Sequence, residues 1–545
     1  MFVGIHGVSR EHRPDVVVVL VDDMGFSDLG CTGSEIRTPN IDSIARNGRM
    51  MTSMYNSARC CPTRASLLTG MYPHNAGVGQ MGANLGSVQY QGFLRDDVMT
   101  IAEVLQLGGY RTLMSGKWHV AGDLWATRVD SWRIGAEGHP TPRQRGFDRF
   151  YGIVDGVASF FSPHFMMRDD ERIDVPPSDF YMTDAVTDEA IGMIDEAISL
   201  DKPYFMYLAY TAPHWPLHAH PEDIEKYRGV YDRGWDYIRQ SRHEQLNSLG
   251  VLENPWAISP RDEKAQPWET IEHKDWEAER MAVYAAMIDR LDQNVGRLLA
   301  HLRAKGTLDN TLILFLSDNG GCAELMQEDG WCKYFPDVNN DGSKVIMGNR
   351  VDVRPGASTT YMSYDLPWAN VSNAPFRKFK HYVHEGGIST PLLAQWPKRF
   401  GSGGISHAAV HVSDILPTVL EATGVNRPRT HHGREMLPLD GESFLPLLDG
   451  RSWERQQPIF FEHEGNSAVR IGNFKLVREF NRSWELYDIV GDRTELNDLA
   501  GSDRRRVESM QASYDDWASR TGVQDWNRLL PKLQEIWEMS DVAQT

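Results

Sequence analysis

The sequence predicts an α/β fold in which a large, mixed and mostly parallel sheet lies between layers of helices. A smaller C-terminal α+β domain with an antiparallel sheet is expected to follow it. Short apolar runs typical of buried strands, with helical patterns between them, predict the first part. A change of pattern near residue 450 predicts the second. We therefore expect a large domain over residues 1–450 and a small domain over residues 451–545.

Four segments are expected to form parallel strands, because each is a short run of apolar, β-branched or aromatic residues. They are Val16–Val21, Arg111–Met114, Tyr204–Tyr210 and Thr311–Leu316. The helical patterns that separate them include Met99–Leu107, Asp184–Ile198 and Ala278–Leu302. Strands that alternate with helices indicate a sheet with helices on both faces.

The C-terminal region is expected to begin with an antiparallel meander. Its strands are Pro458–His463, Ser467–Ile471 and Phe474–Glu479, and Gly-Asn pairs, which favour tight turns, join them. Two helices should follow, over about residues 503–519 and 526–539. The last carries an apolar stripe at helical spacing, Leu529, Leu530, Leu533, Ile536 and Trp537. We expect the stripe to pack on its own domain; the alternative is an oligomer contact through this helix.

Composition excludes some classes of function. Hydrophobic residues make up 41% of the 545 residues and charged residues 24%, as in ordinary globular proteins. A net charge of −19 argues against a nucleic-acid-binding face. The five cysteines indicate neither a disulfide framework nor a zinc site. No signal peptide is evident, and the longest apolar run is too short to span a membrane. We expect a cytoplasmic protein with no membrane partner.

A polar group follows each predicted strand. These groups are Asp22-Asp23, Gly116-Lys117-Trp118-His119, Pro213-His214-Trp215 and Asp318-Asn319-Gly320-Gly321. Each has a structural interpretation on its own, such as an aspartate that caps a helix. Open α/β sheets bind ligands at the carboxyl ends of their strands, so the four groups together indicate a site.

The residue types in this site indicate its chemistry. Asp22, Asp23, Asp318 and Asn319 offer hard oxygen donors, which suit Ca²⁺ or Mg²⁺ rather than zinc. Cationic or hydrogen-bond-donating groups are supplied by Arg64, Lys117, His119, His214 and Lys380. A divalent ion surrounded by fixed cations suits the ester of a tetrahedral oxyanion. Asp337-x-Asn339-x-Asp341-Gly342 begins like a calcium-binding loop, but Gly348 stands where the loop needs Glu, so we interpret it as a surface turn.

The stretch from Cys60 to Gly70 reads as a short helix. Pro62 suits an early helical position and Gly70 can end the helix. Cys60 would then lie at a helix N-terminus, where an anion is favoured. The alternative is a small buried cysteine before a helix. A thiolate phosphatase is excluded, because its cysteine needs an Arg six positions later. Ser66 stands six positions after Cys60, and Leu67 six positions after Cys61.

Cys60-x-Pro62-x-Arg64, followed by Leu68-Thr69-Gly70, resembles the signature of the sulfatases in the alkaline phosphatase superfamily. The resemblance extends to Asp22-Asp23-Met24-Gly25, Thr38-Pro39-Asn40-Ile41-Asp42, Gly116-Lys117-Trp118-His119, Ala212-Pro213-His214, Ser317-Asp318-Asn319-Gly320-Gly321, His384-Glu385-Gly386-Gly387, Leu486-Tyr487-Asp488 and Glu495-Leu496-Asn497-Asp498-Leu499-Ala500. The sequence is most similar to bacterial, cytoplasmic arylsulfatases. This implies an alkaline phosphatase-like fold and hydrolysis of sulfate monoesters, aryl sulfates above all.

The resemblance also implies roles for residues. A separate maturation enzyme would oxidise Cys60 to formylglycine, and the hydrated aldehyde would be the nucleophile. Calcium would be bound by Asp22, Asp23, Asp318, Asn319 and the modified residue 60, and Mg²⁺ or Mn²⁺ can use the same donors. Arg64 would stabilise the hydrate, and Lys117, His214 and Lys380 would bind the sulfate ester. Lys380 is chosen over Lys378 because it stands five residues before Glu385, the family spacing.

The implied reaction has two steps. Asp318 acts as base while a hydroxyl attacks sulfur, and His214 or Lys380 protonates the departing alcohol. His119 then deprotonates the second hydroxyl, so that the sulfated covalent intermediate releases inorganic sulfate. Two alternatives stay open: a phosphonate monoester or phosphodiester hydrolase with the same nucleophile, and a catalytically silent oxyanion-binding protein.

Overall fold

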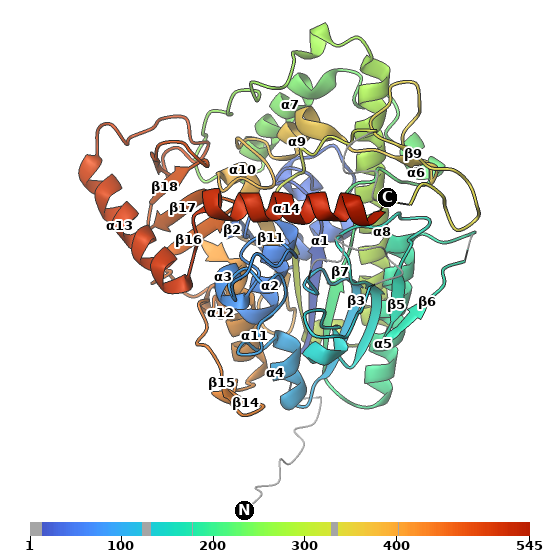
Figure 1. Ribbon diagram of the computed structural model, residues 1–545, viewed down its shortest axis with the longest axis vertical. Coiled ribbons are helices and arrows are strands. Elements are labelled where there is room, and N and C mark those ends of the chain that lie inside the picture. The colour runs from blue at the N-terminus through green and yellow to red at the C-terminus, as the bar shows by residue number, and fades with distance from the viewer. Residues whose placement is uncertain (1–12, 123–131, 177, 329–335, 402, 545) are drawn as a thin grey trace, which may run out of the picture.

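The computed structural model describes residues 13–122, 132–176, 178–328, 336–401 and 403–544 (Figure 1). At its centre is an 11-stranded sheet with strand order β12-β2-β11-β8-β1-β7-β3-β4-β5-β6, and β13 pairs with β2 beside this path. The strands are β1 (Asp15–Val21), β2 (Arg49–Tyr55), β3 (Arg111–Lys117), β4 (Arg149–Ile153), β5 (Met166–Arg168), β6 (Glu171–Ile173), β7 (Tyr204–Ala209), β8 (Thr311–Ser317), β11 (Ser389–Gln395), β12 (Ile405–Ser406) and β13 (Val410–His411).

The sheet is mixed and mostly parallel, as predicted. β1 pairs in parallel with β7 and β8, and β3 pairs in parallel with β4 and β7. β11 runs antiparallel to both of its neighbours, β8 and β2. The four predicted strands correspond to β1, β3, β7 and β8. β3 is longer than predicted and ends at Lys117, because Gly116 lets the strands approach: a Cβ there would lie 1.9 Å from the Ala209 carbonyl oxygen.

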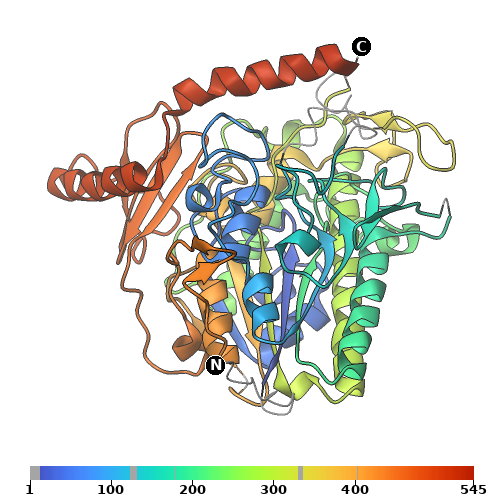
Figure 2. The same ribbon diagram turned by 60° about the horizontal axis from the view of Figure 1, so that its bottom comes forward.

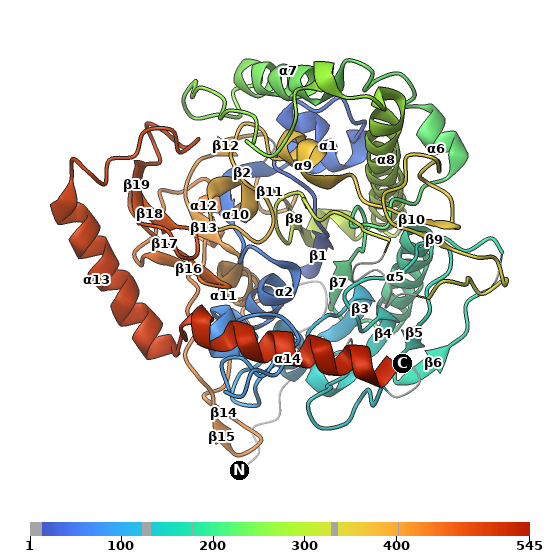
Figure 3. The same ribbon diagram turned by 45° about the horizontal axis from the view of Figure 1, so that its top comes forward.

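Both faces of the sheet are buried. Along β1, Val17, Val19 and Val21 belong to one apolar cluster, and the alternate residues Val16, Val18 and Leu20 to another. The first face is covered by α1 (Pro39–Arg46), α5 (Met182–Ser199), α7 (Gly234–Ser248), α8 (Lys274–Ala304) and α9 (Asp365–Ser372). The second is covered by α2 (Cys60–Thr69), α4 (Ile101–Leu107), α11 (Ile415–Thr423) and α12 (Leu445–Leu448) (Figure 3). The predicted layers of helices are therefore confirmed, with α4, α5 and α8 in the expected segments.

Shorter elements connect these layers. They are α3 (Pro73–Ala76), α6 (Pro221–Glu225), α10 (Glu385–Ile388), the strand pair β9 (Ile346–Met347) and β10 (Thr360–Tyr361), and the hairpin β14 (Thr430–His431) and β15 (Arg434–Glu435). The segment that begins like a calcium-binding loop is a surface turn, in which the Asp341 carboxylate accepts a hydrogen bond from the Ser343 N–H at 2.8 Å. Among the described helices, none combines the length and hydropathy of a membrane span.

The predicted antiparallel meander is confirmed as β16 (Ile459–His463), β17 (Asn466–Ile471) and β18 (Phe474–Arg478). A fourth strand, β19 (Glu485–Asp488), has no counterpart among the predicted strands. Met510, Tyr514 and Trp517 of α13 (Arg504–Thr521) cover one face of this sheet. The other face packs against Tyr55, Ala58, Val383 and Ile388, which surround the segments that carry Cys60 and Lys380.

The last helix, α14 (Trp526–Gln544), lies along the outside of the molecule (Figure 2). Leu529 and Leu533 of its apolar stripe are buried against Leu85 and Tyr90, and Phe480 packs beside them. The expectation that the stripe packs on its own domain is therefore only partly right, because Leu85 and Tyr90 belong to the large predicted domain and Phe480 to the small one. Trp537, at the far end of the stripe, is 55% exposed.

Candidate active site

The predicted site residues meet at the carboxyl ends of the central strands. Asp22 and Asp23 follow β1, and Asp318 and Asn319 follow β8. The Asp318 N–H donates to the Val21 carbonyl oxygen at 3.1 Å, so the strand ladder itself places the two pairs side by side. All four side chains are at most 1% exposed. The sheet thus gathers several carboxylates in a buried position.

Cys60 is the first residue of α2, as the sequence predicts, and Gly70 ends that helix in the left-handed region at φ 69°. The cysteine is 2% exposed. Burial raises the pKa of its thiol, although Lys117 and Lys380 act in the opposite direction. The unmodified side chain is therefore a neutral thiol at neutral pH, and a neutral thiol is a weak nucleophile.

Two buried cations hold the carboxylates. The Nζ of Lys117 lies 2.6 Å from Oδ2 of Asp22, and Nη2 of Arg64 lies 2.7 Å from Oδ2 of Asp318. Arg64 also donates to the Lys117 carbonyl oxygen at 3.1 Å, so the helix that carries Cys60 is tied to the end of β3. Burial and the neighbouring Asp22 raise the pKa of Asp318 to about 7, against the effect of Arg64. Despite burial, Lys117 and the other cations hold the pKa of Asp22 below its usual value.

A second set joins Asp23, Lys380 and His214. The Nζ of Lys380 lies 3.0 Å from Oδ2 of Asp23 and 3.2 Å from Nε2 of His214. His214 Nδ1 is 2.7 Å from the Trp215 carbonyl oxygen, which can only accept, so Nδ1 carries the proton and Nε2 a lone pair. Burial lowers the pKa of His214, and Lys380 adds to that effect.

The structure also separates Lys380 from Lys378. Nζ of Lys378 lies 2.6 Å from Oε1 of Glu479 and over the ring of Tyr382, so it pairs with the C-terminal sheet. Of these two lysines, only Lys380 contacts the site carboxylates. Lys380, which stands five residues before Glu385, is thus the lysine that contacts Asp23.

His119 lies two residues after the end of β3, in the left-handed region at φ 55°. Among the described residues its Nδ1 is buried without a hydrogen-bond partner. Burial, Lys117 and Arg64 together hold the pKa of His119 well below its usual value. A Cβ on Gly156 would lie 2.6 Å from His119 Nε2, so only glycine leaves this ring its place. The result is a neutral imidazole that can accept a proton.

The oxygen donors fit a hard divalent cation. Asp22 Oδ1 and Asn319 Oδ1 are buried and have no hydrogen-bond partner in the described part of the chain. Asn319 Nδ2 donates to Asp23 Oδ1 at 2.7 Å, which fixes the orientation of the amide. Leaving buried acceptors unpaired is costly, and two aspartates and an amide oxygen are ligands that Ca²⁺ accepts. The donor set therefore suits an oxygen-ligated metal ion.

Glu324, which was not predicted, connects several parts of the site. Its Oε1 lies 2.9 Å from Nη2 of Arg59, the residue before Cys60, and its Oε2 accepts from the Trp215 indole N–H at 2.9 Å. Oε2 also lies 3.7 Å from Nζ of Lys380. Its place six residues after Asp318, in the loop that leaves the active edge of the sheet, is the signal that could have identified it.

The segment between residues 331 and 368 contains tryptophans and tyrosines, which can either line a substrate mouth or pack in the core. Trp368 is fully buried, and its ring centroid lies 5.6 Å from that of Trp235, so it belongs to the core. Trp331 and Tyr334 lie outside the described residues.

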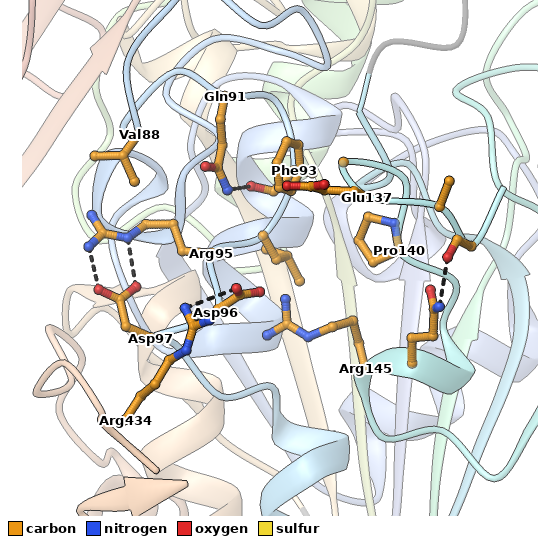
Figure 4. Close-up of a pocket in the computed structure, with 15 residues that line it drawn as sticks. Val88, Gln91, Phe93, Arg95, Asp96, Asp97, Glu137, Pro140, Arg145 and Arg434 are labelled. Atoms are coloured by element: carbon orange, nitrogen blue, oxygen red, sulfur yellow. Dashed lines mark hydrogen bonds and ion pairs between the residues drawn. The ribbon is translucent and has the colours of Figure 1, made fainter. Parts of the chain in front are cut away.

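A cavity of about 760 Å³ lies away from these residues (Figure 4). None of the predicted site residues lines it. Its arginines are already paired: Arg95 with Asp97, Arg434 with Asp96, and Arg145 with Glu103. Among the described residues that line the cavity, every arginine is therefore already paired, and the candidate chemistry lies at the strand ends instead.

Comparison with known proteins agrees with this geometry. The family model described as Sulfatase matches residues 14–425, and the model described as N-sulphoglucosamine sulphohydrolase, C-terminal, matches residues 376–515. An uncharacterised sulfatase of Schizosaccharomyces pombe is 32% identical, over 90% of this chain and 91% of its own. An arylsulfatase of Klebsiella aerogenes is 32% identical, over 84% and 96%. The crystal structure of Ps i-CgsB is 25% identical, with a TM-score of 0.66 and 93% of each chain covered. The chain belongs to the sulfatase family.

Proposed function

We propose that this chain hydrolyses sulfate monoesters, with aryl sulfates as its principal substrates, after a separate maturation enzyme has oxidised Cys60 to formylglycine. One observation carries the proposal. Cys60 lies at the N-terminus of α2, where the charges of Lys117 and Lys380 favour an anion and those of Asp22 and Asp318 oppose it. An anionic ester placed there meets fixed cations rather than water, which is the arrangement that stabilises developing negative charge.

The modified residue supplies a hydrated aldehyde with two hydroxyl groups, and a hard divalent ion, Ca²⁺ for preference, supplies positive charge beside it. Asp318, whose charge acts on residue 60, is the base to which we assign the proton of the attacking hydroxyl. Lys117 Nζ and Lys380 Nζ bind the sulfate oxygens. Lys380, which donates to His214 Nε2, can pass a proton to the departing alcohol oxygen. His119 accepts the second proton, because its ring is neutral.

The aryl preference is supported by the 32% identity to an arylsulfatase over most of both chains. A cytoplasmic location is supported by the scarcity of cysteine, five in 545 residues. We also retain an oligomer contact through α14, because Trp537 is 55% exposed on its outer part. These extensions are independent of the chemistry at residue 60.

The deciding experiment compares two substrates. The protein is produced with a maturation enzyme, the aldehyde at residue 60 is verified by peptide mass spectrometry, and kcat/KM is measured for an aryl sulfate and a matched aryl phosphonate monoester. Cys60→Ala is the blank, and we expect it to fold normally and to lack turnover. We expect a preference for the sulfate of more than about a thousandfold, which corresponds to roughly 4 kcal/mol of transition-state preference.

The opposite outcomes are equally informative. A preference for the phosphonate would keep the nucleophile and overturn the substrate. Multiple turnovers by Cys60→Ala would overturn the nucleophile itself. Absence of turnover with both substrates, in protein that carries the aldehyde and the metal ion, would favour the catalytically silent oxyanion-binding protein.

A further inference from the structure

Two histidines and a glutamate meet beside the active site without a role in the chemistry above. His381 directly follows Lys380, His463 is the last residue of β16, and Glu464 is the first residue of the turn into β17. One potential ligand atom from each lies within 4.8 Å of the others. We propose that His381, His463 and Glu464 form a second metal site, for a divalent transition metal such as Zn²⁺, that is separate from the oxygen-ligated site.

The distances suit a small ion with nitrogen ligands. Nδ1 of His381 lies 3.1 Å from Oε2 of Glu464, and Nε2 of His463 lies 3.9 Å from Oε1 of Glu464. Zinc bonds of about 2.0–2.1 Å in tetrahedral geometry place ligand atoms roughly 3.3 Å apart. The two observed separations, each to a different oxygen of Glu464, bracket that value, and one ligand atom from each residue lies within 4.8 Å of the others. Two imidazoles and one carboxylate favour zinc over calcium.

His463 supplies the independent observation. It is 0% exposed, and neither of its ring nitrogens has a hydrogen-bond partner among the described residues. The 3.9 Å approach to Glu464 is too long for a hydrogen bond. The neutral form of a ring buried in this way presents a lone pair on one of its nitrogens. A metal bond to Nε2 would use that lone pair.

The surroundings hold the other two ligands in place. The side-chain amide of Gln80 donates to Glu464 Oε1 at 2.7 Å. The backbone N–H of His381 donates to the Ala58 carbonyl oxygen at 2.8 Å. His381 has a φ of 88°, a conformation rare outside glycine that is found at ligand clamps and active sites. Zinc would bind Nδ1 of His381 in place of its proton. The proton would then be on Nε2, so the 3.3 Å hydrogen bond that Asn466 donates to Nε2 would be lost. Arg59, the nearby cation, is already paired with Glu324 at 2.9 Å.

The site would join the two parts of the chain. His381 belongs to the segment that presents Lys380, and His463 and Glu464 belong to the first hairpin of the C-terminal sheet. An ion bound here would fasten that sheet next to Lys380 on one side and, through Ala58, next to Cys60 on the other. The inferred role is therefore structural: the ion would hold the C-terminal sheet against the segments that carry Lys380 and Cys60, and it would not form a second catalytic centre.

Zinc binding tests the inference without any activity measurement. The full chain carries Cys60→Ala, which removes the thiol from the first site, and is kept in excess Ca²⁺. Zinc retained after dialysis is measured by elemental analysis, and Zn²⁺-dependent thermal stability is measured in parallel. We expect one zinc per chain. His463→Ala should lose it, Glu464→Gln should bind at least tenfold more weakly, and the exposed control His273→Gln should behave as the parent.

Three results would overturn the site. The first is that the parent retains no zinc. The second is that the parent and Glu464→Gln bind zinc with equal affinity. The third is that His273→Gln loses as much zinc as His463→Ala. Glu464→Gln preserves the shape of the side chain, so the test remains decisive even when His463→Ala fails to fold. Co²⁺ replaces Zn²⁺ as a spectroscopic probe, and a cobalt spectrum typical of nitrogen ligands that disappears in the His463 variant would support the assignment.

Discussion

The Nζ of Lys380 donates a hydrogen bond of 3.2 Å to Nε2 of His214, while it also lies 3.0 Å from the carboxylate of Asp23. The carboxylate of Asp23 favours the charged lysine. The histidine is neutral, because Nδ1–H donates to the Trp215 carbonyl oxygen and Nε2 must keep a lone pair to accept from Lys380. A charged donor beside a neutral acceptor is an arrangement that can both bind an anionic ester and pass a proton to its alcohol.

The first prediction concerns this lysine. Lys380→Met keeps the length of the side chain and removes its charge, so we expect kcat/KM for an aryl sulfate to fall about 10²- to 10³-fold, as for the loss of one charge-stabilising donor. Lys378→Met is the matched control. That lysine pairs with Glu479 instead, so its loss should change kcat/KM by less than about threefold. Equal losses in the two variants would contradict the assignment of Lys380.

The second prediction concerns Glu324 as a positioning residue. Its carboxylate touches Arg59 and the Trp215 indole and approaches Lys380, so Glu324→Gln should let Lys380 move relative to Cys60. We expect a loss in kcat/KM of roughly 10- to 100-fold, the value of a hydrogen bond to a charged group. Glu324→Asp should recover part of it. In the Lys380→Met background, Glu324→Gln should lower kcat/KM only slightly further, because the effects of substitutions at coupled residues are not additive. A fully additive loss would show that Glu324 acts elsewhere.

Most of the site could be predicted from the sequence because it is built from strand ends. Asp22, Lys117 and Asp318 each end a short apolar run or follow it directly, and the parallel ladder brings such ends together. Cys60 could be placed because Pro62 and Gly70 mark a short helix. Each of these patterns is local in the sequence, and the pairing of the strands brings the residues together in space.

The rest depends on contacts between distant segments. Glu324 is identified as part of the site only when its neighbours Arg59 and Lys380 are seen beside it. The pairing of α14 with Leu85 and Tyr90 is likewise invisible in the stripe, because an apolar face does not specify its partner. The end of β3 was missed for another reason: Gly116 is a poor strand former, and only the close approach to Ala209 explains its place there.

The third prediction concerns the metal ion. Removal of calcium with a chelator should abolish turnover and lower the melting temperature, and added Ca²⁺ should restore both, because binding to the folded state alone stabilises it. Asn319→Ala removes an amide oxygen that has no hydrogen-bond partner among the described residues, so we expect at least tenfold weaker calcium binding. Asp341→Asn, in the surface turn that begins like a calcium loop, should leave binding unchanged. Calcium affinity lost in the turn variant and kept in Asn319→Ala would refute the oxygen site.

The fourth prediction concerns the junction between Glu385 and the C-terminal sheet. Glu385 Oε1 lies 2.9 Å from Nζ of Lys475, and Oε2 lies 2.8 Å from Nε of Arg493, with all three side chains buried. Burial alone would raise the pKa of Glu385, but Lys475 and Arg493 lower it to about 2 from 4.5. The folded state thus binds the proton more weakly than the unfolded chain. The stability from this group is present above about pH 4.5 and is lost as the pH falls toward about 2.

Glu385→Gln measures that contribution. It removes the carboxylate that pairs with the buried Arg493, while Lys475 keeps Glu495 at 2.9 Å. We therefore expect the free energy of unfolding to fall by about 3–5 kcal/mol near neutral pH. The difference from the parent should shrink as the pH is lowered below about 4.5, because the parent then loses its own charge. Urea unfolding at several pH values, followed by fluorescence, gives the comparison. The partly exposed Glu479→Gln is the control and should cost at most about 1 kcal/mol. A deficit that stays constant from neutral pH down to about pH 3 would show that Glu385 contributes by packing and not by its charge, since only the ionised form is stabilised by Lys475 and Arg493.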